Sequence, residues 1–235
     1  MPTQDARFHS PLRVFEKALD GGLRPGELGV VLARRGVGKT ALLVGLAVDA
    51  LLQDRPVLHI STEESVGELR RFYAEVFQRL ADSLGLPDRM QRQLDMERNR
   101  HILVYNRKEF SLDKLRQSAA FLAEAADFRP QVLVMDGTPR YEHTEQWEID
   151  GLKELAGELG AAIWTSSLLH REDQATDDRG VPLPVARYDA DLSVIVLLEP
   201  ERDHVQVRVV KAAGLGDARP PRLELDPRTL LLRWR

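Results

Sequence analysis

Residues 28–43 read LGVVLARRGVGKTALL, in which an apolar run of strand length passes through a glycine-containing loop into a run with helical spacing. The loop nearly matches G-x-x-x-x-G-K-[ST], the pattern of phosphate-binding loops, but alanine occupies its first position. Backbone N–H groups that curve into a helix N-terminus bind phosphate, a lysine reaches the outer phosphates, and a Ser or Thr hydroxyl binds the metal. The expected phosphate contacts are Ala33, Arg34, Arg35, Gly36, Val37, Gly38, Lys39, Thr40 and Ala41. The alternative is a glycine-containing turn with an accidental lysine.

Apolar runs of strand length alternate with segments of helical period along most of the chain, the pattern of βα units around a parallel sheet. We expect parallel strands within residues 28–32, 56–61, 101–106, 131–136 and 161–167, with helices between them. The polar stretch 87–100 is interpreted as a surface excursion or a frayed helix.

The C-terminal part of the chain has a different pattern. Runs at 191–199, 204–211 and 223–235 carry strand residues and turn signals without a helix, so we expect antiparallel strands at one edge of the sheet. The prediction is an α/β fold in which a mostly parallel central sheet is flanked by helices. Residues 1–235 are expected to form one domain, with an N-terminal lead-in over 1–20 and a β-hairpin tail over 212–235.

The composition limits the partners and metals that the chain can bind. Lys plus Arg number 33 and Asp plus Glu 37, giving a formal charge of −4, so binding of nucleic acid would require a local basic patch. The chain has no cysteine, and its six histidines show no ligand-like spacing, which leaves an oxygen-bound ion such as Mg²⁺. No apolar stretch reaches the roughly 18 residues of a membrane span, and the N-terminus lacks the apolar run of a signal peptide. We therefore expect a cytoplasmic protein without a membrane partner.

A carboxylate ends the apolar run VLVMD, at Asp136. Ligands of open α/β sheets bind at the carboxyl ends of strands, and Mg²⁺ at such a site needs an anionic or water-mediated anchor. We expect Thr40 and Asp136 to hold the metal. The alternative is a buried aspartate that begins an ordinary turn.

Hydrolysis needs a base or an orienting group for the attacking water. Glu63 and Glu64 follow the run PVLHIS, and either could instead be an acidic residue in the first turn of the next helix. We assign the catalytic role to Glu63 and the helix start to Glu64.

Four ordered segments together resemble the RecA-type ATPase core, in particular the branch of DnaB-like helicases and KaiC-like ATPases. They are LDGGLRPGELGVVLARRGVGKT (19–40), VLHISTEES (57–65), QVLVMDG (131–137) and DADLSVIVLLE (189–199), and the resemblance extends over the chain from about Leu12. The helicase branch commonly begins its loop A-R-x-x-x-G-K-T, as Ala33-Arg34 does here. The resemblance implies ATP with Mg²⁺, Glu63 as the water-activating residue, and catalysis at subunit interfaces of a homo-oligomeric ring or filament, of which a hexamer is one form.

The chain departs from this branch at two places. The strand after the metal-binding aspartate usually ends in a polar pair, often Ser-Gln, that senses the γ-phosphate, and here the pair is Ser166-Ser167. The trans-acting finger is commonly Lys-x-Arg, and the matching residues are Lys211-Ala212-Ala213. Lys211 could still reach a neighbour's phosphate, or it could be an ordinary lysine at a strand end. The arginine of the finger is missing here. Because a finger residue can raise the rate of hydrolysis by several orders of magnitude, we expect slow turnover or a switch-like role.

The loops that contact DNA in RecA-like rings correspond to residues 137–150 and 170–189. Their cations are Arg140, Arg171, Arg179 and Arg187, and their acids are Glu142, Glu145, Glu148, Asp150, Glu172, Asp173, Asp177, Asp178 and Asp189. This is the opposite of the cationic surplus that backbone binding needs. Tyr141, Trp147 and Tyr188 could stack on bases, but Trp147 falls on an apolar helix face and is expected in the core.

Arginine is richer in two other segments. These residues are Arg89, Arg92, Arg98, Arg100, Arg107 and Lys108 in one, and Arg219, Arg222, Arg228, Arg233 and Arg235 in the other. Interspersed acids favour a solvated face or a subunit contact for both segments.

Three functions follow from the sequence. The favoured one is a slow Mg²⁺-dependent ATPase of the RecA/KaiC kind that drives or reports an assembly or signalling state. The second is a nucleic-acid-stimulated motor, helicase or recombinase, which the acidic loops disfavour. The third is a nucleotide-binding interaction module whose hydrolysis is vestigial.

Overall fold

The computed structural model describes residues 15–16, 21–169, 175–212, 223–227, 229 and 231–234. Several sequence predictions fall on residues outside these ranges. They are most of the lead-in 1–20, the loop residues Arg171, Glu172 and Asp173, Ala213, and the tail arginines Arg219, Arg222, Arg228 and Arg235.

Within the described residues, nine strands form one sheet in the order β3-β2-β4-β5-β1-β6-β7-β8-β9. The strands are β1 (Leu28–Ala33), β2 (Val57–Ser61), β3 (Arg100–Val104), β4 (Val132–Asp136), β5 (Ala162–Leu168), β6 (Leu192–Pro200), β7 (Val205–Lys211), β8 (Leu223–Leu225) and β9 (Leu232–Trp234). Neighbours from β3 to β6 pair in parallel, and β6 to β9 pair antiparallel. The predicted α/β fold, with antiparallel strands added at the C-terminal edge, is confirmed.

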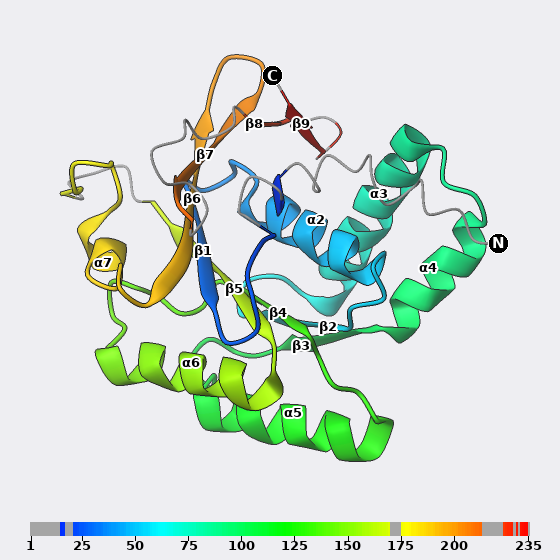
Figure 1. The fold of residues 1–235 in the computed structure, drawn as a ribbon, viewed down its shortest axis with the longest axis horizontal. Coiled ribbons are helices and arrows are strands. Elements are labelled where there is room, and N and C mark those ends of the chain that lie inside the picture. Colours follow the sequence, from blue (N-terminus) through cyan, green and yellow to red (C-terminus); the bar gives the residue numbers. More distant parts are fainter. Residues whose placement is uncertain are drawn as a thin grey trace.

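Helices cover both faces of this sheet (Figure 1). They are α2 (Lys39–Leu51), α3 (Val66–Leu84), α4 (Arg89–Arg98), α5 (Leu112–Ala126), α6 (Gln146–Leu159) and the short α7 (Leu183–Ala186). The polar stretch 87–100 therefore contains a regular helix, α4. Among the described residues, no helix combines the length and the apolar character needed to cross a bilayer.

Alternation along each strand divides the core between the two faces. Val31 and Ala33 of β1 pack in the cluster with α2 and α3, whereas Val30 and Leu32 pack in the cluster with α5 and α6. Successive side chains of a strand point to opposite faces, and a strand covered on both faces must be apolar on both. This is why the sequence of β1 is a continuous apolar run. The strand is buried up to its last residue, Ala33, and the loop follows directly.

The parallel register brings four strand ends to one edge of the sheet. Ser61 of β2 lies beside Asp136 of β4, and Ala33 of β1 lies beside Leu168 of β5. The loops that follow these strands therefore share one edge, where ligands of open α/β sheets bind.

Candidate active site

The loop between β1 and α2 begins from a fixed strand end. Ala33 is fully buried, and its carbonyl accepts a 2.8 Å hydrogen bond from the backbone N–H of Leu169. Because Ala33 is the last residue of the strand, its extended backbone accommodates a Cβ. This explains how alanine can stand at a position where the loop pattern has glycine.

The other end of the loop requires glycine. Gly38 is the N-cap of α2 with a left-handed φ of 115°, which side chains rarely adopt. Lys39 and Thr40 follow as the first residues of α2. Their placement at a helix N-terminus gives the backbone N–H groups and the dipole that favour a phosphate.

Asp136 connects this helix start to two neighbouring strands. Thr40 Oγ1 donates a 2.6 Å hydrogen bond to Asp136 Oδ2, and Ser166 Oγ donates a 2.7 Å hydrogen bond to Asp136 Oδ1. Ser166 Oγ also accepts a 2.9 Å hydrogen bond from the backbone N–H of Gly137. The carboxylate is fully buried, so these hydroxyls fix its orientation toward α2.

Glu63 follows the end of β2, the strand beside β4, and its side chain packs against Gly137. A Cβ at Gly137, whose φ is +82°, would lie 2.4 Å from Cγ of Glu63 and 2.7 Å from Oγ1 of Thr62. Glycine is therefore required there for both its backbone conformation and its lack of a side chain. Arg107, in the loop between β3 and α5, donates a 3.0 Å hydrogen bond to Glu63 Oε1.

The start of α3 differs from the prediction for Glu64. Ser65 caps α3 in a capping box with Glu68, which is the acidic residue of the first turn, so Glu64 precedes the helix. Burial, followed by the nearby carboxylates of Glu68, Asp136 and Glu63, raises the pKa of Glu64. Its backbone N–H donates to Ser61 Oγ at 2.9 Å, as that of Glu63 does at 3.1 Å. Both glutamates are therefore positioned by the end of β2 rather than by the helix.

Three cavities lined by described residues lie along this edge of the sheet. The loop cavity, about 770 Å³, is lined by Arg35, Gly36, Gly38, Lys39, Thr40, Ala41, Thr62, Glu63, Glu64, Phe72, Arg107 and Leu168. The inner cavity, about 70 Å³, is lined by Lys39, Glu63, Arg107, Gly137, Pro139, Arg140, Glu142, Ser166, Ser167 and Leu168. The side cavity, about 320 Å³, includes Arg107, Phe110, Arg140, His143 and Trp147 in its lining. A volume of several hundred Å³ is the usual size of a small-molecule site.

The oxygen ligands at this edge are those of a hard cation. Among the described residues, no cluster of three or more His, Cys, Asp or Glu side chains could enclose a metal. Mg²⁺ commonly uses one or two carboxylates and completes its shell with phosphate oxygens and waters. The hydroxyl of Thr40 beside the carboxylate of Asp136 fits that ion together with a phosphate ligand.

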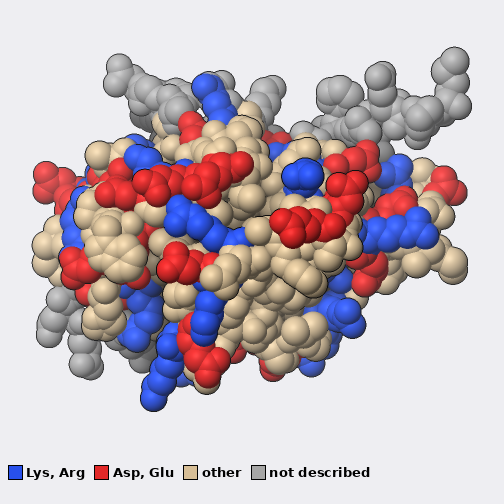
Figure 2. Space-filling view, turned by 90° about the horizontal axis from the view of Figure 1, so that it is seen from below, with Lys and Arg blue, Asp and Glu red and all other residues tan. Residues whose placement is uncertain are grey.

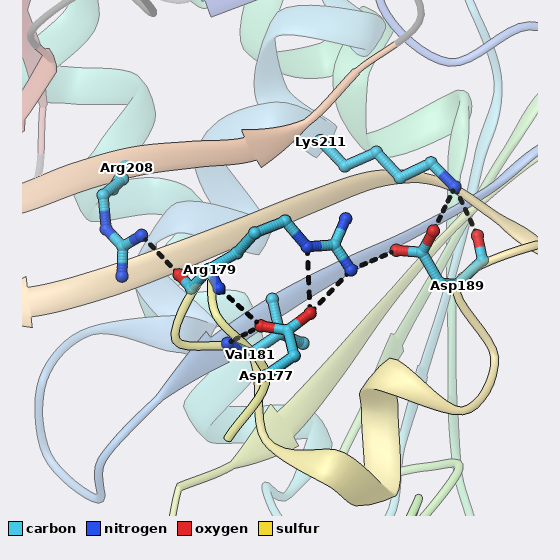
Figure 3. Close-up of polar contacts among 6 residues, drawn as sticks. All are labelled: Asp177, Arg179, Val181, Asp189, Arg208 and Lys211. Atoms are coloured by element: carbon cyan, nitrogen blue, oxygen red, sulfur yellow. Dashed lines mark hydrogen bonds and ion pairs between the residues drawn. The ribbon is translucent and has the colours of Figure 1, made fainter.

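Lys211 lies away from these cavities. Lys211 is paired with Ile195 of β6, and Ile195 is paired with Val30, three residues before the end of β1. Lys211 lines none of the three cavities. Its ammonium bonds Asp189, donating to the backbone carbonyl and, at 3.2 Å, to Oδ2 (Figure 3). Lys211 therefore cannot contact a phosphate at the loop of its own chain.

The two described arginines of the loop before β6, Arg179 and Arg187, also have partners within the chain. Arg179 donates to the carboxylates of Asp177 and Asp189 at 2.7 and 2.8 Å (Figure 3). Arg187 donates to the backbone carbonyls of Tyr141 and Thr144. These side chains hold the loop in place.

The aromatic residues of the two loops are placed differently from the prediction. Trp147, expected in the core, is 67% exposed, because it lies in the first turn of α6, beyond the end of β4, and lines the side cavity. Tyr141 and Tyr188 are buried, and their hydroxyls bond Thr165 and the carbonyl of Thr144. The two tyrosines therefore cannot stack on a base at the surface.

Sequence reasoning missed the roles of Arg107 and Gly137 in placing Glu63. The sequence pattern places Arg107 only in an arginine-rich solvated face or subunit contact. Its position just after the third strand, at the same sheet edge as Glu63, was the available signal. For Gly137 the signal was a glycine directly after the predicted metal-binding Asp136.

Comparisons with known proteins bear on this site. A protein-family model described as "AAA domain" matches residues 1–145, more than half of the chain. Lys39, Thr40, Glu63, Arg107 and Asp136 lie inside the matched segment. No curated protein matches the chain.

Proposed function

The chain belongs to the AAA-domain family of P-loop NTPases, and on this premise we propose that it binds ATP with Mg²⁺ and hydrolyses it slowly, as a RecA/KaiC-like switch for an assembly or signalling state. The observation that carries the proposal is the hydrogen bond of 2.6 Å between Thr40 Oγ1 and Asp136 Oδ2. It joins the first turn of α2 to Asp136, the buried carboxylate at the end of β4. The loop cavity beside this pair supplies the room for a nucleotide.

Each of these residues has a role that its position supports. The backbone N–H groups of residues 34–41 and the ammonium of Lys39 would bind the phosphates. Thr40 and Asp136 would hold Mg²⁺, which when bound neutralises phosphate charge. Glu63, which lines both the loop cavity and the inner cavity, would orient the attacking water and accept its proton. Ser166, which bonds Asp136 and lines the inner cavity, would report the outermost phosphate.

Slow turnover is supported by the surroundings of Lys211. A finger residue acts by stabilising charge on the transferred phosphate. The ammonium of Lys211 is bonded to Asp189 in its own chain and lies away from its own loop cavity. It could act only on the nucleotide of a neighbouring copy in a ring or filament, and only after leaving Asp189.

A nucleic-acid-driven motor has less support. Figure 2 shows acidic and basic side chains intermixed over the face formed by α5 and α6, without an extended basic surface among the described residues in view. The arginines at 179 and 187 bond within the chain, and the tyrosines at 141 and 188 are buried. Backbone binding requires accessible surplus cations.

An ATPase titration with and without single-stranded DNA, with mass measured by light scattering in the same samples, tests the proposal. We expect Mg²⁺-dependent turnover that DNA does not stimulate. Lys39→Ala should abolish nucleotide binding, and Glu63→Gln should abolish turnover while binding persists. Lys108→Ala, which removes an exposed cation outside the three cavities, is the matched control and should behave as the wild type.

Each other outcome selects a different function. Stimulation by DNA at low salt would support the motor. Turnover unchanged in Glu63→Gln, together with lost binding in Lys39→Ala, would support the module with vestigial hydrolysis. A monomer in saturating ATP would remove the interface mechanism.

A further inference from the structure

Arg107 is the residue shared by all three cavities of the candidate site. Its guanidinium forms a 3.0 Å ion pair with Glu63 Oε1, and the two side chains are 49% and 36% exposed. In the loop cavity it shares the lining with Lys39, Thr40 and Gly36, which belong to the phosphate-binding loop. One cation therefore borders both the proposed base and the space for the phosphates.

The backbone that carries Arg107 is held in place. The N–H of Tyr105 donates to the carbonyl of Ser61 at 3.0 Å, which ties this loop to the end of β2. Asn106 accepts bonds from the next turn, through its carbonyl from Glu109 and through its side chain from the N–H of Lys108. The fixed backbone and the half-exposed side chain leave the guanidinium as the part that can change partner.

Two anions then compete for one guanidinium. An exposed ion pair such as that of Arg107 and Glu63 contributes little to stability, about 0–1 kcal/mol. Breaking it therefore requires little energy. A terminal phosphate carries more charge than a carboxylate and accepts two parallel N–H bonds from arginine. A triphosphate can supply such a group in this cavity, whereas a diphosphate lacks the outermost phosphate.

We propose that Arg107 is the specificity-determining residue that distinguishes a nucleoside triphosphate from a diphosphate at this site, by transferring its guanidinium from Glu63 to the terminal phosphate. The transfer has a second effect, because it frees the carboxylate of Glu63 only when a triphosphate is bound. This inference rests on the proposed function, since it concerns the same nucleotide cavity.

A double-mutant cycle of binding affinities tests the transfer. The affinities of the non-hydrolysable β,γ-imido analogue of ATP and of ADP, each with Mg²⁺, are measured by calorimetry for the wild type, Arg107→Ala, Glu63→Gln and the double variant. Arg107→Ala should weaken the triphosphate analogue about tenfold, a usual size for coupling between two groups, and change ADP less than about twofold. Glu63→Gln should tighten the analogue several-fold, because Arg107 no longer has a carboxylate to leave. In the Arg107→Ala background the same Glu63→Gln change should have no effect.

The controls separate this transfer from simpler causes. Lys108→Ala removes the same charge from the adjacent position and should leave the ratio of the two affinities unchanged. If Glu63→Gln tightens the analogue equally in both backgrounds, charge repulsion by Glu63 explains the gain and the transfer is overturned. The same holds if Arg107→Ala binds both nucleotides as Lys108→Ala does.

The cycle also distinguishes failure of this inference from failure of the proposed function. Nucleotide binding that depends on Lys39 but shows no change of ratio in Arg107→Ala overturns the inference alone. Absence of Lys39-dependent binding in the wild type overturns the proposed function, and the inference with it.

Discussion

Charged side chains line cavities at the carboxyl ends of β1, β2 and β3, whereas beside β6 and β7 the same residue types bond one another away from those cavities. In the first region Lys39, Glu63 and Arg107 all border the loop cavity. In the second, Arg179 bridges Asp177 and Asp189, and Lys211 completes the network (Figure 3). The comparison shows that an arginine or a lysine near a loop is not enough to indicate ligand binding. The side chain must also border a cavity in which it can contact the ligand.

The electrostatics of the second region agree with this distinction. Burial alone would raise the pKa of the Asp189 carboxyl, but hydrogen bonds from Arg179 and Lys211 hold it below its ordinary value. The pKa of Asp177 is lowered in the same way, against burial, by the N–H of Val181 and by Arg179. The carboxylates of Asp177 and Asp189 therefore stay ionised to a lower pH than a free aspartate, because N–H groups and cations of the same chain stabilise their charge. Their role is structural.

The largest effect on the first region should come from Gly137→Ala. The new Cβ would lie 2.4 Å from Cγ of Glu63, so Glu63 must move. A displacement of about 1 Å in a catalytic group can lower a rate about 100-fold, and we expect a fall in turnover of that order. Steady-state ATPase measurements check it. Gly157→Ala, in α6 with nothing within 4 Å of the new Cβ, is the control, and activity retained in Gly137→Ala would show that Glu63 is not the base.

Acid should destabilise the two regions in different pH ranges. Burial lowers the pKa of His59 on β2 from 6.5 to about 4, with Asp136 acting to raise it and Arg100 to lower it. Since the unfolded chain takes up this proton first, stability should fall as the pH drops from 6.5 to 4, by on the order of 2–3 kcal/mol. The network of Asp177 and Asp189 contributes stability above their ordinary pKa of 3.8 and loses it only as the pH falls below that value.

Urea unfolding across this pH range checks the order of the two losses. His59 bonds the hydroxyl of Tyr73 through Nδ1 at 3.0 Å, and His59→Asn retains a polar atom near that position. This variant should lose the slope between pH 6.5 and 4 while the wild type keeps it. An equal slope in both proteins would assign the acid sensitivity to other groups.

Asp189→Asn should separate stability from nucleotide binding. The change removes the anion shared by Arg179 and Lys211, and because these side chains are partly exposed we expect a loss of about 1 kcal/mol in the free energy of unfolding. Nucleotide affinity should stay at the wild-type value, since Asp189 lines none of the three cavities. Denaturant unfolding and calorimetry measure the two quantities. Asp127→Asn, at a carboxylate 95% exposed, is the control, and we expect no loss of stability in it. Weaker nucleotide binding in Asp189→Asn would show that the network beside β6 and β7 affects the nucleotide cavity, against the prediction.

Sequence reasoning reached the fold because local rules and tertiary structure agree there. The buried run at residues 28–33 is apolar on both faces, and the loop pattern after it fixes one strand–loop–helix unit. Asp136 could be placed because it ends such a run. The roles assigned to Lys39, Thr40, Glu63, Asp136, Ser166 and Lys211 remain predictions that the experiments above test.

The side-chain partners could not be predicted in this way. Arg107 and Glu63 are 44 positions apart, and only the order of β3 and β2 in the sheet brings them together. The pairing of Lys211 with Asp189 likewise depends on the antiparallel register of β6 and β7. The residues next to a charged side chain in the sequence do not indicate which residue it will bond. That partner is set by the order and register of the strands in the sheet.

The smallest effect should come from Trp147→Ala. Trp147 and Trp164 give an aromatic comparison between a side chain that borders a cavity and one that packs in the core. Trp147 is 67% exposed, whereas Trp164 on β5 is 6% exposed and packs in the core. Truncating Trp164 should lower the free energy of unfolding by about 3–5 kcal/mol, and truncating Trp147 should change it by less than about 0.5 kcal/mol. Urea unfolding followed by far-ultraviolet circular dichroism measures both without depending on the removed fluorophore. A loss of more than about 2 kcal/mol in Trp147→Ala would contradict the exposed placement, because only a packed ring gives a change of that size. A change within the expected limit would agree with an accessible ring that lines the side cavity together with Arg107. The fluorescence of Trp147 could then be used to detect binding of a ligand in that cavity.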